Sequence, residues 1–578
     1  MKLPASYFSV SLPLVKENLR RYWAIPAISF LVYFFSGVFT LLISYSVGSR
    51  YWYVEDMLRN HNFFFMAAHL IVPIIVGAVV LRYIQKSASV TSLHAMPFTR
   101  AKLFNSSVLS GLLLILAPII LTGILLLLIS TPVYRQGSSA AAEAAAVNIF
   151  ARPRILYWMW ESFIIILSLY AVTVFAGLVT GTSFMHTAMG IFFNFLIPAL
   201  FGIFTVYCGM YLYGFSASDE WTSIALGISP YLQVFAEGGS FPPLLQILYI
   251  LAAIFLLALS MFLYYKRKLE RATEAFVFGV MATAISYLIA FFGMTLFGFY
   301  FQSVLGGDNF HYAGLLLGAV IFLLIGRMIV KKTFRVFNRR TFKSMGIYLL
   351  LAAVFVLSFT QDLTGFETRV PAPNRVNSFT IRGFQGFPSR SAYNDFRFNE
   401  SPVLSSAENI ASIREFHASI IENRENRAHY YRSWTWGEIN YDLSGIVNMR
   451  RNYNNIDAGL IRSNRGLAQI FESEEYKSHF YFANADIARL VSIDVDIGGR
   501  PRDLVSQRGS MEELLARIDM DFRAHTYLDE LGAQNGRIFA SLSVRYEAPG
   551  GSGSSYAHVA VPMTYSNTIA WLRENGYD

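Results

Sequence analysis

The sequence predicts a polytopic α-helical membrane protein with about nine spans, followed by an α+β extracytoplasmic domain. Of its 578 residues, 54% are hydrophobic and only 15% are charged, whereas an ordinary soluble protein has about 25% charged residues. Apolar stretches of about 20 residues, long enough to cross ~30 Å of hydrocarbon, recur through residues 1–361. From residue 362 the composition becomes polar, so the chain divides into a membrane part and a C-terminal domain.

Nine apolar stretches have the length and composition of membrane spans. They are residues 24–47, 63–84, 108–130, 155–180, 188–213, 244–265, 275–301, 313–330 and 345–359. The last is the shortest, and only residues 181–187 separate the fourth from the fifth. Tyr, Trp and Tyr at 51–53 belong to the aromatic clusters expected where spans leave the hydrocarbon.

The charge is distributed unevenly along the chain. Residues 1–361 contain 24 Lys/Arg and 11 Asp/Glu, and the remaining 217 residues contain 23 and 27. The excess of positive charge therefore belongs to the membrane part, where it sets topology, and no nucleic-acid partner is predicted.

Basic residues in the connections predict the orientation. The N-terminus and every second connection carry 19 Lys/Arg, and the alternate connections carry 5. Because basic connections stay in the cytoplasm, we expect a multi-pass cell-membrane protein with a cytoplasmic N-terminus. An odd number of spans then places the C-terminal domain outside the cell. No cleaved signal peptide is expected, since Met1–Arg21 lacks a basic segment followed by an apolar core.

The sequence lacks the residues that several classes of chemistry require. The single cysteine, Cys208, excludes an internal disulfide or a multi-cysteine zinc site. There is no Gly-Lys dipeptide, hence no Walker A loop, and the ten histidines form no HExxH motif. We therefore predict no catalytic residue, cofactor or metal site.

Two polar residues lie inside predicted spans. Glu161 is the only carboxylate in the nine stretches, which argues against an intramembrane aspartyl protease. It either faces water or a partner within the membrane, or lies at the interface level with Trp158 and Trp160. His69 either lines a polar path or forms a hydrogen bond to a neighbouring helix.

Residues 1–22 predict a helix lying at the cytoplasmic membrane surface. From Pro13 onward, Val15, Leu19 and Tyr22 share one face, and basic residues occupy the other. Such a helix contacts membrane lipid. A loose basic anchor is the alternative.

A second cytoplasmic segment, residues 85–105, predicts a short helix exposed at the membrane surface. Val90, Leu93 and Met96 form a small apolar face, Pro97 ends the helix, and Arg100 leads into the third span. An apolar face on such a helix can bind a cytoplasmic partner. An ordinary loop with positive-inside charge is the alternative.

The C-terminal part predicts a linker over 362–405 and a folded α+β domain over 406–578. Helices are expected at 408–423, 511–522 and 568–574. Strands at 439–443 and 446–450 flank Ser444-Gly445 as a hairpin, and further strands are expected at 491–497, 537–546 and 557–565.

Residues 1–271 resemble the permease subunits of ABC-2-type transporters. The resemblance rests on the interfacial helix, the nearly loopless fourth-to-fifth turn, the basic end of the sixth span, and the sequence Leu-His-Ala-Met-Pro-Phe-Thr-Arg at 93–100. It implies a six-span permease domain over 23–271 that forms a dimer with an identical or paralogous permease. It also implies a separate ABC ATPase subunit acting on a cytoplasmic coupling helix. The implied coupling residues are Ser92, Leu93, His94, Pro97, Phe98 and Arg100.

The chain departs from a minimal permease in two respects. Three additional spans lie within 272–361, and a large domain follows that is similar to an uncharacterised domain of some bacterial permeases. We expect a permease subunit that moves an unidentified substrate with energy from the separate ATPase. A polytopic receptor or scaffold whose external domain senses a ligand is the alternative. An ion-coupled transporter or channel is disfavoured, because such proteins usually keep several intramembrane charges for ions and only Glu161 is present. A membrane enzyme is the remaining hypothesis.

Overall fold

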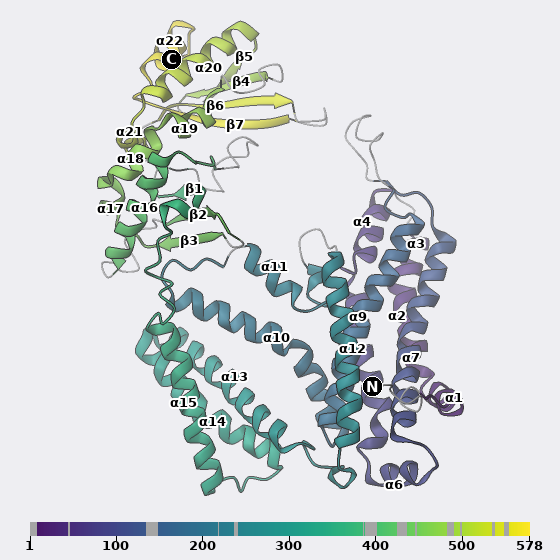
Figure 1. Cartoon of the computed structure of the whole chain (residues 1–578). Coiled ribbons are helices and arrows are strands. Elements are labelled where there is room, and N and C mark those ends of the chain that lie inside the picture. Colours follow the sequence, from purple (N-terminus) through teal and green to yellow (C-terminus); the bar gives the residue numbers. More distant parts are fainter. Residues whose placement is uncertain are drawn as a thin grey trace. The chain divides into compact units, whose positions relative to one another are not determined.

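The computed structural model describes residues 9–43, 47–134, 148–217, 219–235, 241–384, 387, 401–424, 436–445, 448–482, 490–497, 500–533, 538–547 and 554–577. The chain forms two compact units. Among the described residues, the helical unit lies within 9–134, 148–206 and 219–357, and the C-terminal unit lies within 207–217 and 358–577. Figure 1 labels the elements of both.

In the described part of the chain, nine helices are long and apolar enough to cross a membrane, which confirms the nine predicted stretches. The first consists of α2 (Ala24–Tyr33), a π-helical turn (Phe34–Phe39) and α3 (Thr40–Ile43). The others are α5 (Phe63–Val80), α7 (Arg100–Ile129), α9 (Arg152–Val179), α10 (Ser183–Tyr211), α12 (Pro243–Lys266), α13 (Gly279–Leu305), α14 (Asp308–Lys331) and α15 (Arg339–Thr360). These helices indicate a multi-pass membrane protein.

Two further helices occur where no helix was predicted, and the second candidate span, Tyr51–Val80, includes most of the first of them. Helix α4 (Val47–Leu58) contains the aromatic cluster at 51–53 and precedes α5, and α11 (Asp219–Gly227) follows α10. A left-handed residue, Asn60 (φ 57°), separates α4 from α5. The side chain of Asn62 then accepts hydrogen bonds from the backbone N–H groups of Phe64 and Phe65, which caps α5.

The predicted surface helix is present as α1 (Leu12–Arg21), with proline in its first turn. Val15 is buried, and basic residues lie in the last turn. The Ser11 backbone N–H donates to Ser106 Oγ at 2.8 Å, and Asn18 Nδ2 donates to Ser110 Oγ at 3.0 Å. Polar contacts therefore attach α1 to α7.

Helices α13 and α14 pack closely because two glycines of α14 have no side chain. A Cβ atom at Gly314 would lie 2.4 Å from the carbonyl oxygen of Phe297, and one at Gly318 would lie 2.8 Å from that of Gly293. The GxxxG spacing in this pair thus serves helix packing.

The C-terminal unit contains two antiparallel sheets. The first has the order β1-β2-β3, formed by Val376–Gly383, Trp436–Leu443 and Met449–Asn454. Helices α16 (Ala407–Glu422), α17 (Ala458–Ser463), α18 (Arg465–Glu472) and α19 (Glu474–Lys477) belong to the same region, and residues of α16 to α19 share a buried apolar core with this sheet. The predicted hairpin is confirmed, although its second strand begins at Met449.

The second sheet has the order β5-β4-β6-β7. Its strands are Arg500–Val505, Leu490–Ile497, Ile538–Glu547 and Ser554–Pro562, and Figure 1 shows β6 and β7 side by side. Helices α20 (Arg508–Ala524) and α22 (Ser566–Glu574) contribute to its apolar core, and α21 (Tyr527–Ala533) follows α20. The two helices and three strands predicted in this half are present, although β7 ends at Pro562 and not at residue 565, and β5 and α21 were not predicted.

The predicted linker contains a core strand. Strand β1 lies within 362–405 and pairs with β2 along its length, with Phe379 and Ile381 1% and 0% exposed. Proline and asparagine residues around it hide the alternation of buried and exposed positions that identifies a strand. Residues 388–400 lie outside the described residues. The C-terminal unit also begins at Ser358 rather than at 406.

Candidate functional site

The predicted coupling segment forms helix α6, Ser87–Ala95, which ends before Pro97 as expected. Its apolar face is directed differently from the prediction. Val90 is 5% exposed and packs inside the chain, Leu93 is half-buried, and Met96 is 47% exposed. A partner could therefore touch Met96 and part of Leu93, but not Val90.

The remaining surface positions of this segment are polar or lie in the turn to α7. Ser92 is exposed, and its Oγ donates to the Ser89 carbonyl oxygen at 3.3 Å. After Pro97, the Phe98 backbone N–H donates to the Met96 carbonyl oxygen at 2.7 Å. The hydroxyl of Thr99 then caps α7 by accepting from the backbone N–H of Lys102. The segment is thus an ordered helix and turn.

A chain of hydrogen bonds joins α6 to the end of α12. His94 Nδ1 lies 2.9 Å from the Val90 carbonyl oxygen, so it donates there, and Nε2 accepts from the Tyr264 hydroxyl at 3.0 Å. The hydroxyl of Tyr83, which follows α5, donates to the Tyr264 hydroxyl at 3.3 Å. His94 therefore bonds α6 directly to α12, and Tyr264 connects this bond to the turn that follows α5.

Arg100 holds the carboxyl end of α12 from the first turn of α7. Its guanidinium donates to the carbonyl oxygens of Tyr264, Tyr265 and Arg267 at 3.2, 2.9 and 3.4 Å. The last carbonyls of a helix have no partner within the helix and carry partial negative charge. A cation at this position therefore fixes the end of α12 against the start of α7.

Arg267 holds the carboxyl end of α9 in the same way. It is 2% exposed. Its guanidinium donates to the carbonyl oxygens of Gly177, Leu178 and Thr180 in or just after α9, and to that of Ile84, just before α6, at 2.8–3.1 Å. Burial lowers the pKa of Arg267 to about 10, so the group remains charged at neutral pH.

A buried polar pair completes this region. Gln85 Nε2 lies 2.8 Å from His186 Nδ1, and His186 Nε2 lies 2.8 Å from the Thr173 carbonyl oxygen. These contacts link the start of the α6 segment to α10 and α9. We name the set of His94, Arg100, Tyr264 and Arg267 with their partners the α6 junction.

The connections that carry most of the basic residues lie at this same end of the helices. Beyond the Arg267 contacts, the Thr273 backbone N–H donates to the Gly181 carbonyl oxygen at 2.8 Å, and Lys332 Nζ donates to the Thr273 carbonyl oxygen at 2.5 Å. The connections after α5, α9, α12 and α14 thus meet at one end, as alternating spans require.

The two intramembrane candidates are separate from the α6 junction. Glu161 is 2% exposed, and no donor in the described residues reaches its Oε1 atom. His69 is 1% exposed, and its Nδ1 donates to the Phe65 carbonyl oxygen of its own helix at 2.7 Å. Among the described residues, neither side chain forms a hydrogen bond with residues 92–100, and Glu161 does not lie at the surface of the chain.

The contacts of the α6 junction join the ends of helices to one another. Its charged groups bind backbone carbonyls at helix ends, and its histidine lies between a carbonyl and a tyrosine hydroxyl. His94, Pro97 and Arg100 were predicted from the sequence. The sequence analysis did not identify five other residues of this region: Arg267, Tyr264, Tyr83, Gln85 and His186. Arg267 lies in a run of basic residues, and the other four resemble the polar residues that are common near the ends of spans.

Comparisons with known proteins give no assignment for this chain. No family model, no curated protein and no solved structure matches it.

Proposed function

We propose that the chain is the membrane-spanning permease subunit of an ATP-driven transporter of the ABC-2 type. A separate ATPase subunit would supply the energy, and an identical or paralogous permease would complete the assembly. The observation that carries this proposal is the α6 junction, in which a short exposed helix is hydrogen-bonded to the ends of several span-length helices.

The contacts of the α6 junction support a path for movement. A push on α6 acts on α12 through His94 and Tyr264, and the adjoining turn acts on α12 through Arg100. The Arg267 guanidinium then connects the end of α12 to the end of α9 and to the chain leading into α6. Because charge-assisted hydrogen bonds are strong and directional, the helix ends would move together.

The connectivity supports an extracytoplasmic C-terminal domain in the cell membrane. The connections with most basic residues meet at the α6 end, which the positive-inside rule assigns to the cytoplasm. Residues 207–217, the last turn of α10 and the chain after it, and the described residues from 358 onward, at the end of α15, both belong to the C-terminal unit. Spans five and nine end on the same side when spans alternate, namely the side opposite the N-terminus.

The proposal is tested by purifying the tagged full chain in mild detergent from its native host and identifying the chains that accompany it. We expect a stoichiometric subunit with a P-loop. If a monodisperse preparation lacks such a subunit, the alternative, a receptor or scaffold whose external domain senses a ligand, replaces the transporter.

Substitutions on α6 sharpen the same test. Leu93→Asp and Met96→Asp place a charge on the surface offered to the ATPase, and we expect substrate-stimulated ATPase activity of the reconstituted complex to fall about tenfold, the equivalent of ~1.4 kcal/mol. Met563→Asp is the matched control, because Met563 is also exposed (57%) but lies in the C-terminal unit. Unchanged ATPase activity in both α6 variants would show that the ATPase subunit does not bind to α6.

A further inference from the structure

The chain that follows α10 is built into the C-terminal unit. Residues 207–217, which comprise the last turn of α10 and the chain after it, cluster with that unit. The Gly214 carbonyl oxygen accepts from the backbone N–H of Asn452 in β3 at 3.1 Å, and the Tyr213 backbone N–H donates to Glu367 Oε1 at 2.7 Å. The segment is therefore hydrogen-bonded to two other parts of the unit.

Aromatic packing reinforces these hydrogen bonds. The rings of Tyr213 and Tyr453 have centroids 4.9 Å apart, and those of Phe215 and Phe366 are 6.1 Å apart. The guanidinium of Arg451 lies 3.7 Å from the centroid of the Phe366 ring and donates to the Phe366 carbonyl oxygen at 2.9 Å. Such pairs add stabilisation beyond the area they bury.

Glycine is required at the centre of this contact. Gly214 has a φ of 80°, and a Cβ atom there would lie 2.7 Å from the Tyr453 ring. A side chain would be strained by the backbone conformation and would also collide with Tyr453. The close approach of residues 213–215 to β3 therefore depends on one residue type.

The surface that receives the segment is itself firmly held. Tyr453 donates its hydroxyl to His417 Nε2 at 2.7 Å, and His417 Nδ1 lies 3.2 Å from the Tyr441 hydroxyl. All three side chains are 0% exposed. Strands β2 and β3 are thus bonded to α16 directly beneath the Tyr213 contact.

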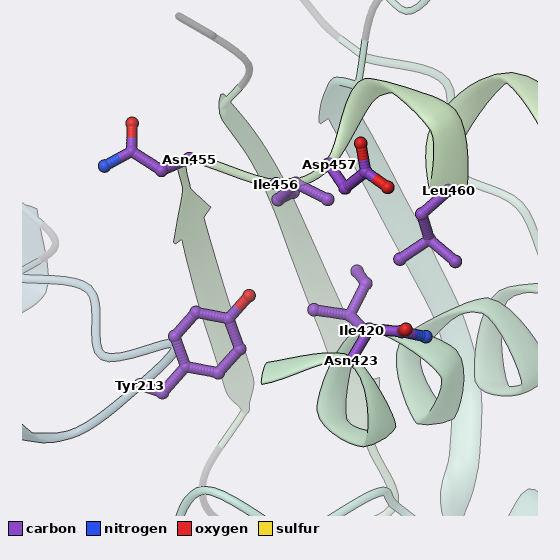
Figure 2. Close-up of a pocket in the computed structure, with 7 residues that line it drawn as sticks. All are labelled: Tyr213, Ile420, Asn423, Asn455, Ile456, Asp457 and Leu460. Atoms are coloured by element: carbon purple, nitrogen blue, oxygen red, sulfur yellow. The ribbon is translucent and has the colours of Figure 1, made fainter. Parts of the chain in front are cut away.

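A small recess, with room for about one water molecule, lies beside Tyr213 in the C-terminal unit (Figure 2). Figure 2 shows the Tyr213 ring entering from its own loop, with residues from α16, from the chain after β3 and from α17 around it. The lining residues are Tyr213, Ile420, Asn423, Asn455, Ile456, Asp457 and Leu460. The ring is held on its Tyr453 side and borders this recess on the other.

The apolar window of α10 is much less buried than that of α9. In its most apolar window 11% of the residues are buried, against 78% in α9. At its carboxyl end, Tyr207 contacts the ring of Phe359, near the end of α15, with centroids 5.9 Å apart. The end of α10 is thus held by residues of the C-terminal unit.

We propose that residues 207–217 are a second anchor of the C-terminal domain, through which the domain and the carboxyl end of α10 move as one body. The first anchor is the direct continuation of the chain from α15. A change in the domain therefore acts on the fifth span as well as on the ninth. This role goes beyond the coupling proposed for α6, and its test requires no ATPase.

The single cysteine of the chain reports on the anchor. Cys208 is 3% exposed and lies in the anchoring segment, so in the detergent-solubilised full chain N-ethylmaleimide should label it slowly. Tyr213→Ala removes the ring contact, and Gly214→Ala introduces the colliding Cβ atom. We expect each variant to increase the labelling rate at least about tenfold, the equivalent of ~1.4 kcal/mol in the opening equilibrium.

Tyr577→Ala is the matched control, because Tyr577 also stacks on a ring, that of Trp571, in the same unit. It should leave the rate unchanged, and Cys208→Ser should abolish labelling. Labelling of Tyr213→Ala and Gly214→Ala at the rate of the unsubstituted chain would overturn the proposal.

A cross-link separates release of the anchor from unfolding of the unit. In a Cys208→Ser background, Tyr213→Cys and Asn455→Cys place thiols on two sides of the recess, where a bifunctional maleimide can join them. Compared with the same double-cysteine protein before cross-linking, we expect the cross-linked protein to exchange its amide hydrogens across residues 207–217 at least about tenfold more slowly. Exchange in β6 and β7 should be the same in both. Unchanged exchange across 207–217 in the joined protein would contradict the anchor.

Discussion

The α6 junction and the C-terminal unit hold their helix ends with charges of opposite sign. At the α6 junction, Arg100 and Arg267 donate to the last carbonyls of α12 and α9. In the C-terminal unit, Glu475 accepts from the backbone N–H groups of Ser405 and Ser406 just before α16, and Asp521 accepts from that of Thr568 at the start of α22. Each charge complements the partial charge of the helix end that it meets.

The difference follows from the charge available in each region. The connections on the α6 side are rich in arginine and lysine, whereas residues 362–578 carry more acidic than basic residues. In both regions the capping charge binds backbone groups, and among the described residues none of these four side chains forms an ion pair. Unpaired backbone groups at buried helix ends are costly, so this comparison predicts that removing a capping charge affects stability more than removing an exposed neighbour.

The largest effect is expected at Arg267. Arg267→Gln cannot reach four carbonyl oxygens at once, so buried acceptors of α9 lose their partners. We expect the free energy of unfolding of the full chain in detergent to fall by about 3–5 kcal/mol, measured as a lower midpoint of denaturant-induced unfolding.

Lys268→Gln is the control for this substitution, because Lys268 is the exposed basic neighbour. It should shift the midpoint by less than about 0.5 kcal/mol. Equal effects of the two substitutions would mean that the end of α9 is held by general positive charge and not by the Arg267 hydrogen bonds.

The features that the sequence predicted are those with local signals. A span needs about 20 consecutive apolar residues, so all nine helices could be found although their ends differ by several residues. Helix α6 could be found because Pro97 ends it and Arg100 begins the next helix. Both signals lie within a few residues of the feature that they identify.

The features that were missed depend on contacts between distant residues. Arg267 meets Ile84 and Gly177 only after the helices pack, and β1 becomes a core strand only by pairing with β2. Likewise nothing near Gly214 predicts that it lies against Tyr453. The burial of Val90 is also a consequence of packing. The pattern of apolar residues in α6 identifies an apolar face but does not show whether that face lies against the rest of the chain or at the surface.

A smaller, pH-dependent effect is expected in the C-terminal unit at His417. Burial, and then the positive charge of Arg451, lower the pKa of His417 to about 3. The unfolded chain takes up a proton near pH 6.5, whereas the folded unit does not. Stability is therefore lost as the pH falls below 6.5, by about 2–3 kcal/mol at pH 4.5.

Amide hydrogen exchange of β2 and β3 in the full chain, measured between pH 7 and 4.5 and corrected for the intrinsic exchange rate, checks this slope. His417→Gln removes the titrating group. Amide protection of β2 and β3 should therefore change less with pH in this variant than in the unsubstituted chain, even if the variant is less stable at every pH. A slope unaffected by the substitution would assign the pH dependence to another group.

The smallest loss of stability is expected from protonation of Glu475, and it occurs at a lower pH than the loss caused by His417. Although burial raises the pKa of Glu475, hydrogen bonds from Ser405, Asn409 and Ser406 outweigh it and lower the pKa to about 2. The stabilisation is present above the unfolded pKa of about 4.3 and is lost as the pH falls towards 2. Because the carboxylate is partly exposed, we expect it to contribute about 1 kcal/mol.

Glu475→Gln should therefore increase exchange at the start of α16 at pH 6 and remove the further increase below pH 4. Glu512→Gln is the control, since Glu512 only forms an exposed pair with Arg508 and should leave α16 unchanged. The carboxyl ends of α12 and α9 should show no such loss in this range, because their capping charges are guanidinium groups that remain protonated in acid. If acid instead weakened both regions equally, the contrast between carboxylate and guanidinium caps would not govern their stability.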